Sequence, residues 1–177
     1  MDFEILNRET IYSGRAFGVQ KVNLLLPNQK ESVFDLVKHN GSVTIVPLDE
    51  AGNIWFVRQY RLGAESQLLE LPAGVLEREE DPLVCAAREV REEIGMGAKE
   101  LQFLGDFYLA PGYSSEHMFV FLATGLFPEE LPHDEDEFLN TVKIPFPQVY
   151  EMAKKGELKD SKSLAALLLA LPHLSIP

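Results

Sequence analysis

Apolar and polar residues along the first third of the chain follow the alternating pattern of β-strands. Four segments are rich in β-branched and aromatic residues, and they span residues 19–27, 31–39, 42–48 and 54–60. The first two flank Asn28 and Gln29, and the last two flank Gly52 and Asn53. Because these residues are typical of tight turns, the pattern predicts two successive hairpins.

A helical spacing replaces the alternation after residue 80. Four apolar residues recur at i, i+3, i+7 and i+11 and predict one buried helix face, namely Leu83, Ala86, Val90 and Ile94. Asp81 and Pro82 are typical of an N-cap and a first helical position, and Gly95 is typical of a helix end. The sequence therefore predicts a helix over 81–94 with one face in the core.

The rest of the chain mixes both kinds of element. Strands are predicted at 101–109, 117–127 and 138–146, and helices near 148–155 and 161–171. No regular strand–helix–strand repeat appears, so the order indicates a mixed α/β class. A length of 177 residues is typical of one domain, with room for a small N-terminal extension.

The charge of the chain narrows the classes of partner. With 28 acidic and 16 basic residues, the net charge is −12 and the pI is about 4.7, which argues against a general nucleic-acid or anionic-membrane binder. No apolar run approaches the roughly 20 residues of a membrane helix. Cys85 stands alone and is expected to be a buried small residue, which fits a cytoplasmic protein without disulfides.

Four carboxylates gather on and beside the predicted helix. Glu89 and Glu93 share a face at i, i+4, Glu92 lies at its edge, and Glu80 directly precedes the helix. Like charges this close repel, and a site with many hard oxygen donors suits Mg²⁺ or Mn²⁺. Arg88 lies four residues before Glu92 and can orient it. The alternative is a solvated helix face with ordinary Arg–Glu pairs.

The spacing of these residues resembles the signature of the Nudix hydrolase family, G-x5-E-x7-R-E-apolar-x-E-E-x-G-apolar. Its positions are occupied in order by Gly74, Glu80, Arg88, Glu89, Val90, Glu92, Glu93, Gly95 and Met96. A chance match has odds on the order of 10⁻⁹ per start position. Glu79 stands where relatives often have glycine, with no functional loss expected.

The resemblance implies an α/β/α sandwich with a mixed sheet that hydrolyses nucleoside diphosphates linked to another group, with Mg²⁺ or Mn²⁺. By position, Glu89 and Glu93 are similar to metal ligands, and Glu92 is similar to a metal ligand or a base. The backbone carbonyl of Ala73 is similar to an additional ligand, and Gly74 would give the turn room to place it. Structural positions in the signature are Gly74, Glu80, Arg88 and Gly95.

Features outside this signature resemble the ADP-ribose pyrophosphatase branch. The segments 57–61 and 69–74 and a proline sixteen residues after Gly95 carry this likeness, and they imply a set of substrate-binding residues: Arg58, Arg61, Glu70, Pro111 and Glu116. Strand alternation keeps the two arginines off one face, so at least one should form a salt bridge instead. Glu70 could bind ribose hydroxyls or pair with an arginine, and Pro111 could simply form a turn.

The acidic segment 129–137 and the N-terminal strands complete the likeness. In this branch a glutamate from such a loop is similar to a catalytic base or metal ligand, which favours Glu137 and then Glu135; the alternative is a solvated loop, with His133 on its surface. Residues 1–41 are expected to form an antiparallel β subdomain that makes a homodimer, and residues 42–177 the catalytic domain. Phe17 and Val19 could line an adenine slot or pack in a core.

The expected reaction is hydrolysis of ADP-ribose to AMP and ribose 5-phosphate. One alternative is a different nucleotide sugar, such as GDP-mannose or UDP-glucose. Another is a Nudix-like sensor that binds ADP-ribose without cleaving it, but such proteins usually lose carboxylates that this chain keeps. A panel of substrates separates these alternatives.

Overall fold

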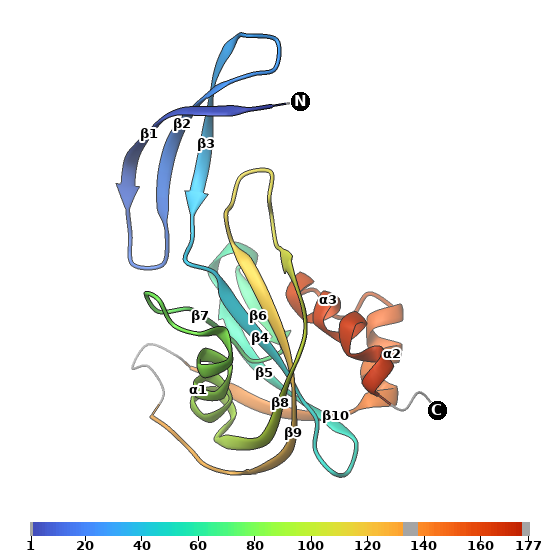
Figure 1. Cartoon of the computed structure of the whole chain (residues 1–177). Helices are drawn as coiled ribbons and strands as arrows, with labels where there is room; N and C mark the ends of the chain where they lie inside the picture. Colours follow the sequence, from blue (N-terminus) through green and yellow to red (C-terminus); the bar gives the residue numbers. More distant parts are fainter. Residues whose placement is uncertain (1, 133–137, 175–177) are drawn as a thin grey trace. The chain divides into compact units, whose positions relative to one another are not determined.

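Three N-terminal strands form an antiparallel sheet in the computed structural model, which describes residues 2–132 and 138–174 (Figure 1). The strands are β1 (Glu4–Ser13), β2 (Gly18–Leu25) and β3 (Glu31–Lys38), in that order across the sheet. The predicted hairpin of β2 and β3 is confirmed, with Gly18 opposite Lys38 and Leu25 opposite Glu31. Gln29 lies in its turn with a left-handed φ of 62°.

The chain divides into two units. The first unit comprises Met1–Gly41 and Tyr108–His117, and the second comprises Ser42–Phe107 and Met118–Pro177. Within the first unit the backbone N–H of Val37 on β3 donates to Tyr113 O at 2.7 Å, and Ser115 N–H donates to Val37 O at 3.0 Å. These bonds tie the 108–117 loop to the end of β3.

The second unit contains two sheets, with strand orders β10–β5–β6 and β7–β4–β9–β8. The strands are β4 (Ser42–Pro47), β5 (Asn53–Arg61), β6 (Ser66–Glu70), β7 (Ala73–Val75), β8 (Met96–Tyr108), β9 (His117–Pro128) and β10 (Asn140–Pro145). The helices are α1 (Pro82–Ile94), α2 (Phe146–Lys154) and α3 (Ser161–Ala170), with short 3₁₀ turns at Leu62–Ala64 and Leu171–His173. Strands β4 and β9 are parallel, so the sheet is mixed, as expected.

The prediction of a second hairpin is wrong. A turn does form, with Gly52 N–H donating to Asp49 O at 3.0 Å, but the flanking strands meet only at one bridge between Leu48 and Ile54. Beyond the bridge β4 and β5 belong to different sheets. Every residue of β4 is buried. The strand lies between β7 and β9 in its sheet and is covered on both faces, instead of pairing with β5 in a hairpin.

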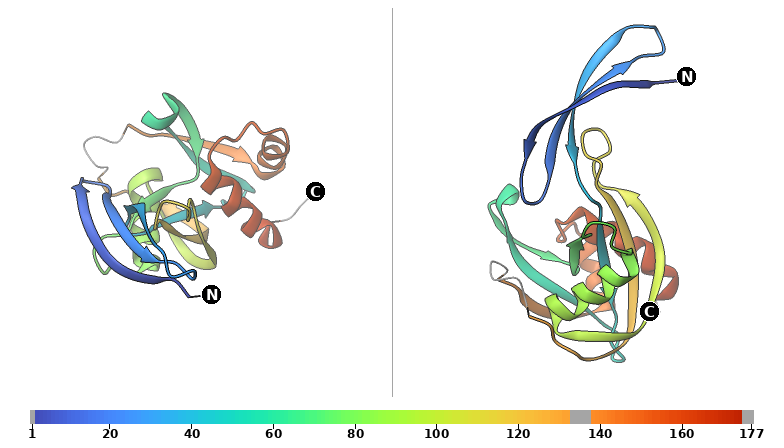
Figure 2. Two further views of the ribbon diagram at one scale, coloured as in Figure 1. Left: turned by 90° about the horizontal axis from the view of Figure 1, so that it is seen from above. Right: turned by 60° about the vertical axis from the view of Figure 1, so that its left-hand side comes forward.

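Helices cover both faces of the second unit, with α1 on one side and α2 and α3 on the other (Figures 1 and 2). Two hydrophobic cores lie on the two sides of β4, and residues of this strand contribute to both. Val43 and Ile45 pack with Val90 of α1, whereas Val46 packs with Leu167 of α3. The result is the predicted sandwich of helix, sheet and helix.

The signals for the start and end of α1 are confirmed. The Asp81 side chain accepts a hydrogen bond from Leu83 N–H at 2.8 Å, and Gly95 ends the helix with φ 69°. The apolar stripe is right for Ala86, Val90 and Ile94 but wrong for Leu83, which is 46% exposed. The buried position near the start of the helix is taken by Cys85. None of the described helices is long and apolar enough to cross a membrane.

Candidate active site

Strand β7 and helix α1 meet at Gly74. A Cβ built on Gly74 would collide with the carboxylate of Glu89. Glycine is therefore needed here because the Glu89 side chain fills the space that any other residue would take. That this glycine also gives the turn room to place the Ala73 carbonyl stays a prediction.

The second carboxylate of the same helix face is fixed to the same strand. Glu93 Oε2 accepts a hydrogen bond from Ala73 N–H at 3.0 Å. Glu93 is 3% exposed and Glu89 is 7% exposed, so both carboxylates are buried. Buried carboxylates are costly unless they are hydrogen-bonded or paired with cations, which marks this corner as a site built for charge.

Arg88 contacts three carboxylates on and beside helix α1. Its Nη1 lies 2.6 Å from Glu89 Oε1 and 2.8 Å from Glu92 Oε2, which confirms the predicted contact with Glu92. Its Nε and Nη2 each lie 3.2 Å from an oxygen of Glu80. One guanidinium thus holds three carboxylates, which we call the Arg88 cluster (Glu80, Arg88, Glu89 and Glu92). Such planar, charge-assisted contacts fix side-chain orientation as well as charge.

The local charges stabilise the ionised forms of the cluster. Burial favours the neutral form of Glu80, but hydrogen bonds from Arg88 and from Glu77 N–H outweigh it and lower the pKa of Glu80. Burial also works against the charge of Arg88, yet Glu80, Glu89 and Glu92 raise the pKa of that guanidinium. Both groups therefore stay charged at neutral pH.

Cys85 is a buried neighbour of this cluster. Burial, and next the charge of Glu89, raises the pKa of its thiol well above the ordinary value. The thiol therefore stays protonated at neutral pH, as expected for a small packing residue.

A second group of charges lies at the end of β6, and we call it the Glu70 cluster (Arg61, Glu70, Asp160 and Lys162). Glu70 is almost fully buried, and Arg61 donates to it from Nε and Nη2, each at 2.8 Å. Lys162 of α3 also donates to Glu70 and lies 3.0 Å from Asp160 Oδ1. Burial works against the charge of Glu70, but Arg61 and Lys162 outweigh it and lower its pKa. Of the two alternatives for Glu70, the structure shows the pairing with an arginine.

The other residues predicted for substrate lie in several places. Arg58 is exposed on β5, and strand alternation separates it from Arg61, as expected. Pro111 and Glu116 belong to the 108–117 loop of the first unit, where Pro111 is exposed in a turn and Glu116 is half-buried. Glu135, Glu137 and His133 lie outside the described residues.

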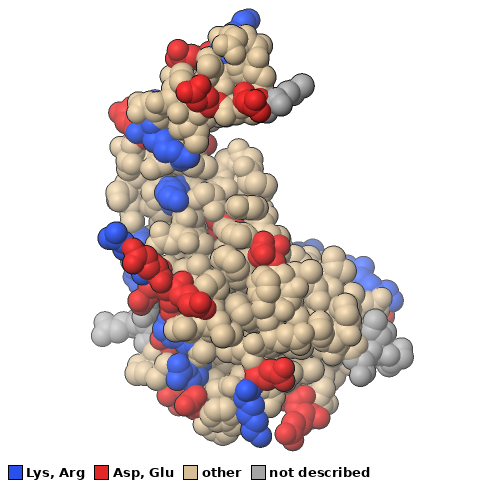
Figure 3. All heavy atoms as spheres, in the orientation of Figure 1, with Lys and Arg blue, Asp and Glu red and all other residues tan. Residues whose placement is uncertain are grey.

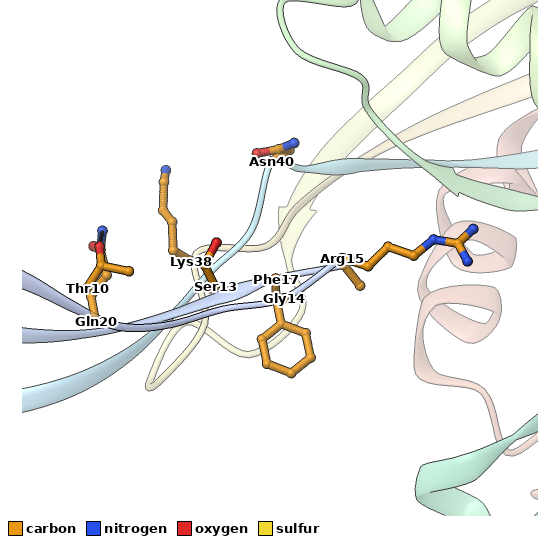
Figure 4. A pocket seen from close by; sticks show the side chains of 10 residues that line it. Thr10, Ser13, Gly14, Arg15, Phe17, Gln20, Lys38 and Asn40 are labelled. Atoms are coloured by element: carbon orange, nitrogen blue, oxygen red, sulfur yellow. Dashed lines mark hydrogen bonds between the residues drawn. The ribbon is translucent and has the colours of Figure 1, made fainter.

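The first unit has a cavity of about 290 Å³ around the β1–β2 turn. Phe17 is one of its lining residues, with Arg15 from the same turn and Lys38 from β3 (Figure 4). Phe17 is 44% exposed and its ring lies 6.1 Å from that of Tyr12, so it does not pack in a core within this chain. Val19 is half-buried at the start of β2.

Sequence reasoning missed Lys162. Its ammonium group is buried between Glu70 and Asp160, although lysine is rarely buried without such partners. One signal was available in the sequence. Helix α3 is apolar after its first three residues, and a single lysine in its first turn, two residues after an N-capping aspartate, indicates a local charge partner.

The carboxylates beside Gly74 can be compared with the ligands that a divalent cation requires. Within residues 2–132 and 138–174, no three His, Cys, Asp or Glu side chains already stand in a metal-holding arrangement. Glu89 and Glu92 instead contact Arg88. The residues nevertheless fit Mg²⁺ or Mn²⁺, because hard oxygen donors converge beside Gly74, where the missing Cβ admits the Glu89 carboxylate.

Comparison with known proteins decides the family. The family model of the NUDIX domain matches residues 38–167, which is most of the chain. The chain belongs to the Nudix hydrolase family. It is 34% identical to an ADP-ribose pyrophosphatase of Bacillus subtilis (strain 168), over 94% of this chain and 91% of the relative. It is 37% identical to an ADP-ribose pyrophosphatase of Mycobacterium tuberculosis (strain ATCC 25618 / H37Rv), over 94% and 82%.

A solved structure agrees with this assignment. The crystal structure of an ADP compounds hydrolase superposes with a TM-score of 0.87 at 31% identity and covers 98% of this chain and 94% of its own. The mixed α/β Nudix fold predicted from the signature is thereby confirmed.

Glu79 stands at the position of the signature where a glycine was expected. It adopts a φ of 63°, in the left-handed region that favours glycine. The backbone thus keeps the conformation that suits glycine, and the glutamate side chain adds strain without contacting the carboxylate cluster; the one ion pair described for it is with the exposed Arg78.

Proposed function

We propose that this Nudix hydrolase cleaves the diphosphate of ADP-ribose and releases AMP and ribose 5-phosphate. The observation that carries the proposal is the pair of buried carboxylates, Glu89 and Glu93, held against β7 at Gly74 and Ala73. The choice of substrate is supported by the two relatives named ADP-ribose pyrophosphatase, which align with nearly the whole chain.

Glu89, Glu92, Glu93 and the carbonyl of Ala73 are the groups that would hold Mg²⁺ or Mn²⁺ in our proposal. When bound, such an ion supplies positive charge to the diphosphate oxygens and makes water a stronger nucleophile. The protein contributes the orientation of the donors. Arg88 holds Glu89 and Glu92, and Ala73 N–H holds Glu93, so these hydrogen bonds orient the side chains that would carry the donor oxygens.

The chemical step is attack of water on one phosphorus of the diphosphate. The water loses a proton as its oxygen forms the new P–O bond, and the bond from that phosphorus to the bridging oxygen breaks. Glu92 is a candidate to accept the proton, because its side chain is 25% exposed and reachable by substrate. Glu137 and Glu135 are the other candidates for this role.

Arg61 is our leading candidate for contact with a phosphate oxygen of the substrate. Two of its nitrogens bind Glu70, and its side chain remains 43% exposed. Arginine suits this task because its planar donors match phosphate oxygens. Arg58, Pro111 and Glu116 are further candidates for substrate contact.

We also propose a homodimer formed through the first unit. Strand β1 is exposed along its whole length, including Ile5, Ile11 and Tyr12. Figure 3 shows both charged and uncharged side chains on the visible face of this unit. Exposed apolar strands favour burial against another chain. Light scattering after size exclusion should give twice 19.9 kDa, and a species of 19.9 kDa alone would contradict the dimer.

Product release from a panel of substrates tests the function. ADP-ribose, GDP-mannose, UDP-glucose, NADH and diadenosine polyphosphates are each incubated with the enzyme in Mg²⁺ and in excess chelator. We expect Mg²⁺-dependent release of AMP and ribose 5-phosphate from ADP-ribose in preference to the rest. Preference for another compound would contradict the substrate, and tight binding of ADP-ribose with no cleavage of anything would contradict catalysis itself.

A further inference from the structure

Two neighbouring residues at the start of helix α3 form hydrogen bonds with the end of strand β6 and the residue after it. Lys162 donates to the carboxylate of Glu70, and Ser163 Oγ accepts from Leu71 N–H at 2.8 Å. All four of these residues are buried, so neither contact competes with bulk water. Helix α3 therefore fixes both a side chain and the backbone just before the chain enters β7.

The next two residues of the chain carry this fixation to the carboxylate site. The carbonyl of Pro72 accepts from Ile45 N–H at 2.9 Å and from Thr44 Oγ1 at 3.2 Å. Ala73 N–H then donates to Glu93 Oε2 at 3.0 Å. Residues 70 and 71 are thus held by α3, residue 72 by β4 and residue 73 by α1, and the last bond reaches a proposed metal ligand.

The first turn of α3 is itself ordered by Asp160. Asp160 Oδ2 accepts from Ser163 N–H at 3.0 Å and from Ser163 Oγ at 2.5 Å, while Oδ1 lies 3.0 Å from Lys162 Nζ. The Ser163 hydroxyl thus donates to Asp160 and accepts from Leu71. Buried ion pairs often add little stability over apolar residues of the same volume, so orientation is the more informative role for these charges.

On its other side, Glu70 sets the plane of the Arg61 guanidinium. The two parallel hydrogen bonds use Nε and Nη2, and this geometry directs Nη1 away from Glu70. After Glu70, the charge of Glu93 is among the influences that raise the pKa of Arg61, so the guanidinium lies within the field of the carboxylate site.

We propose that Lys162 and Ser163 are positioning residues of the active site. Lys162 acts through Glu70 to hold Arg61 in the orientation that receives the substrate diphosphate. Ser163 acts through Leu71 to hold the segment that carries Ala73 against Glu93. This inference rests on the proposed diphosphate hydrolysis and assigns to α3 a role in it.

A double-mutant cycle between Lys162 and Arg61 tests the first arm of the proposal, which is the role of Lys162. The variants are Lys162→Met, Arg61→Met and their combination, assayed for KM and kcat on ADP-ribose with Mg²⁺. We expect Arg61→Met to raise KM roughly tenfold or more, because a charge-assisted contact is lost. Lys162→Met should raise KM by roughly threefold to tenfold alone and should add nothing in the Arg61→Met background.

Lys159→Met is the matched control, because Lys159 is exposed just before the cap of α3. It should leave KM unchanged. The arm is overturned if Lys162→Met raises KM by the same factor in both backgrounds, or lowers only the melting temperature. Should Lys162→Met fail to fold, Asp160→Asn replaces it, because asparagine keeps the N-cap while the charge beside Lys162 is removed.

Ser163→Ala tests the second arm of the proposal, which is the role of Ser163. It removes the acceptor of Leu71 N–H, so we expect the Mg²⁺ concentration for half-maximal rate to rise severalfold while KM for ADP-ribose stays unchanged. Ser161→Ala, at an exposed position of the same turn, is the matched control. An unchanged Mg²⁺ dependence in Ser163→Ala would overturn this arm.

A measurement on the free protein separates failure of this inference from failure of the proposed function. Hydrogen exchange of Arg61 Nε–H, followed by ¹⁵N NMR without substrate, should be slow in the parent protein and roughly tenfold faster in Lys162→Met. Equal exchange rates would refute the positioning role even in an active enzyme. Faster exchange with no hydrolysis of ADP-ribose by the parent protein would sustain the Lys162–Glu70–Arg61 linkage and refute the substrate instead.

Discussion

The two charge clusters of the second unit use the same residue types in opposite balance. In the Arg88 cluster one guanidinium contacts three carboxylates, and its side chain and that of Glu92 are each 25% exposed. In the Glu70 cluster one carboxylate contacts two cations, and the Glu70 side chain is only 2% exposed. The Glu70 cluster ties α3 to β5 and β6, whereas the Arg88 cluster ties α1 to the segment directly before it.

The difference in balance separates a site prepared for a ligand from one that holds the fold. A carboxylate bound by two cations in the interior is satisfied and gains nothing from a further ion. Three carboxylates that share one guanidinium near solvent favour the arrival of more positive charge, as a divalent cation would provide. Changes in the Arg88 cluster should therefore affect kcat, whereas changes to Glu70 should affect stability and, through Arg61, KM.

The largest expected effect is on catalysis, in Glu93→Gln. The amide keeps the shape and can still accept from Ala73 N–H, but the charge is lost. We expect kcat to fall by about 10²–10³-fold, while the melting temperature in chelator stays within a few degrees of the parent. Steady-state kinetics and thermal unfolding check both halves, and near-native turnover would remove Glu93 from the proposed ligands.

Glu70→Gln should have its main effect on the stability of the fold. Removing one charge of a buried pair should lower the free energy of unfolding at pH 7 by about 3 kcal/mol. The folded-state pKa of Glu70 lies below the ordinary 4.5, so its contribution is complete above that value and is lost as pH falls through the folded-state pKa. Urea unfolding from pH 7 to pH 3 should therefore show the gap between parent and variant narrowing on acidification.

The control for this measurement is Glu151→Gln, whose carboxylate pairs with Lys154 on the surface. Its unfolding curve should follow that of the parent at each pH. A gap for Glu70→Gln that stays constant down to pH 3 would show that the charge of Glu70 is not what stabilises the fold.

Gly74→Ala tests the space beside the Arg88 cluster. The added methyl group would occupy the position of the Glu89 carboxylate and force it to move. We expect activity at limiting Mg²⁺ to fall by about 10–100-fold, in the range seen when a ligand loses its orientation. Gly63→Ala is the matched control, because a Cβ there meets nothing within 4 Å. Equal activities in the two variants would exclude the steric argument.

The smallest expected effect comes from Glu79→Gly, outside both clusters. Relief of the left-handed strain exceeds the extra freedom that glycine gives the unfolded chain, so stability should rise by about 0.5–1 kcal/mol. Activity should not change. Arg78→Gly, at a neighbouring position that does not have a positive φ, should destabilise instead, and a gain in both variants would point to a cause other than backbone strain.

Local chemistry makes helix α1 predictable from its own residues and their close neighbours. Asp81, Pro82 and Gly95 act on the residues beside them, so the limits of α1 follow from short-range sequence. The same holds for the carboxylates of the Nudix signature, because helical geometry alone places Glu89 and Glu93 on one face. The contact of Arg88 with Glu92 follows in the same way from a spacing of four residues.

Contacts between distant segments were not readable in this way. The hairpin predicted for residues 42–60 has the right turn, but β4 pairs with β9, more than seventy residues away, and that choice depends on the whole sandwich. Lys162 meets Glu70 across 92 residues, and no local pattern in either segment encodes the pairing. Leu83 fits the apolar stripe but lies near the start of the helix, where the position is exposed.

The sequence by itself therefore determined the class of fold, the limits of helix α1 and the placement of its carboxylates on one face, because these depend on residues a few positions apart. The tertiary structure decided which charges meet: Glu89 enters the space at Gly74, and α3 grips the segment before Ala73. These contacts arise because the two hydrophobic cores pack against the sheets of the second unit and bring helix α1 and helix α3 to the same short stretch of chain.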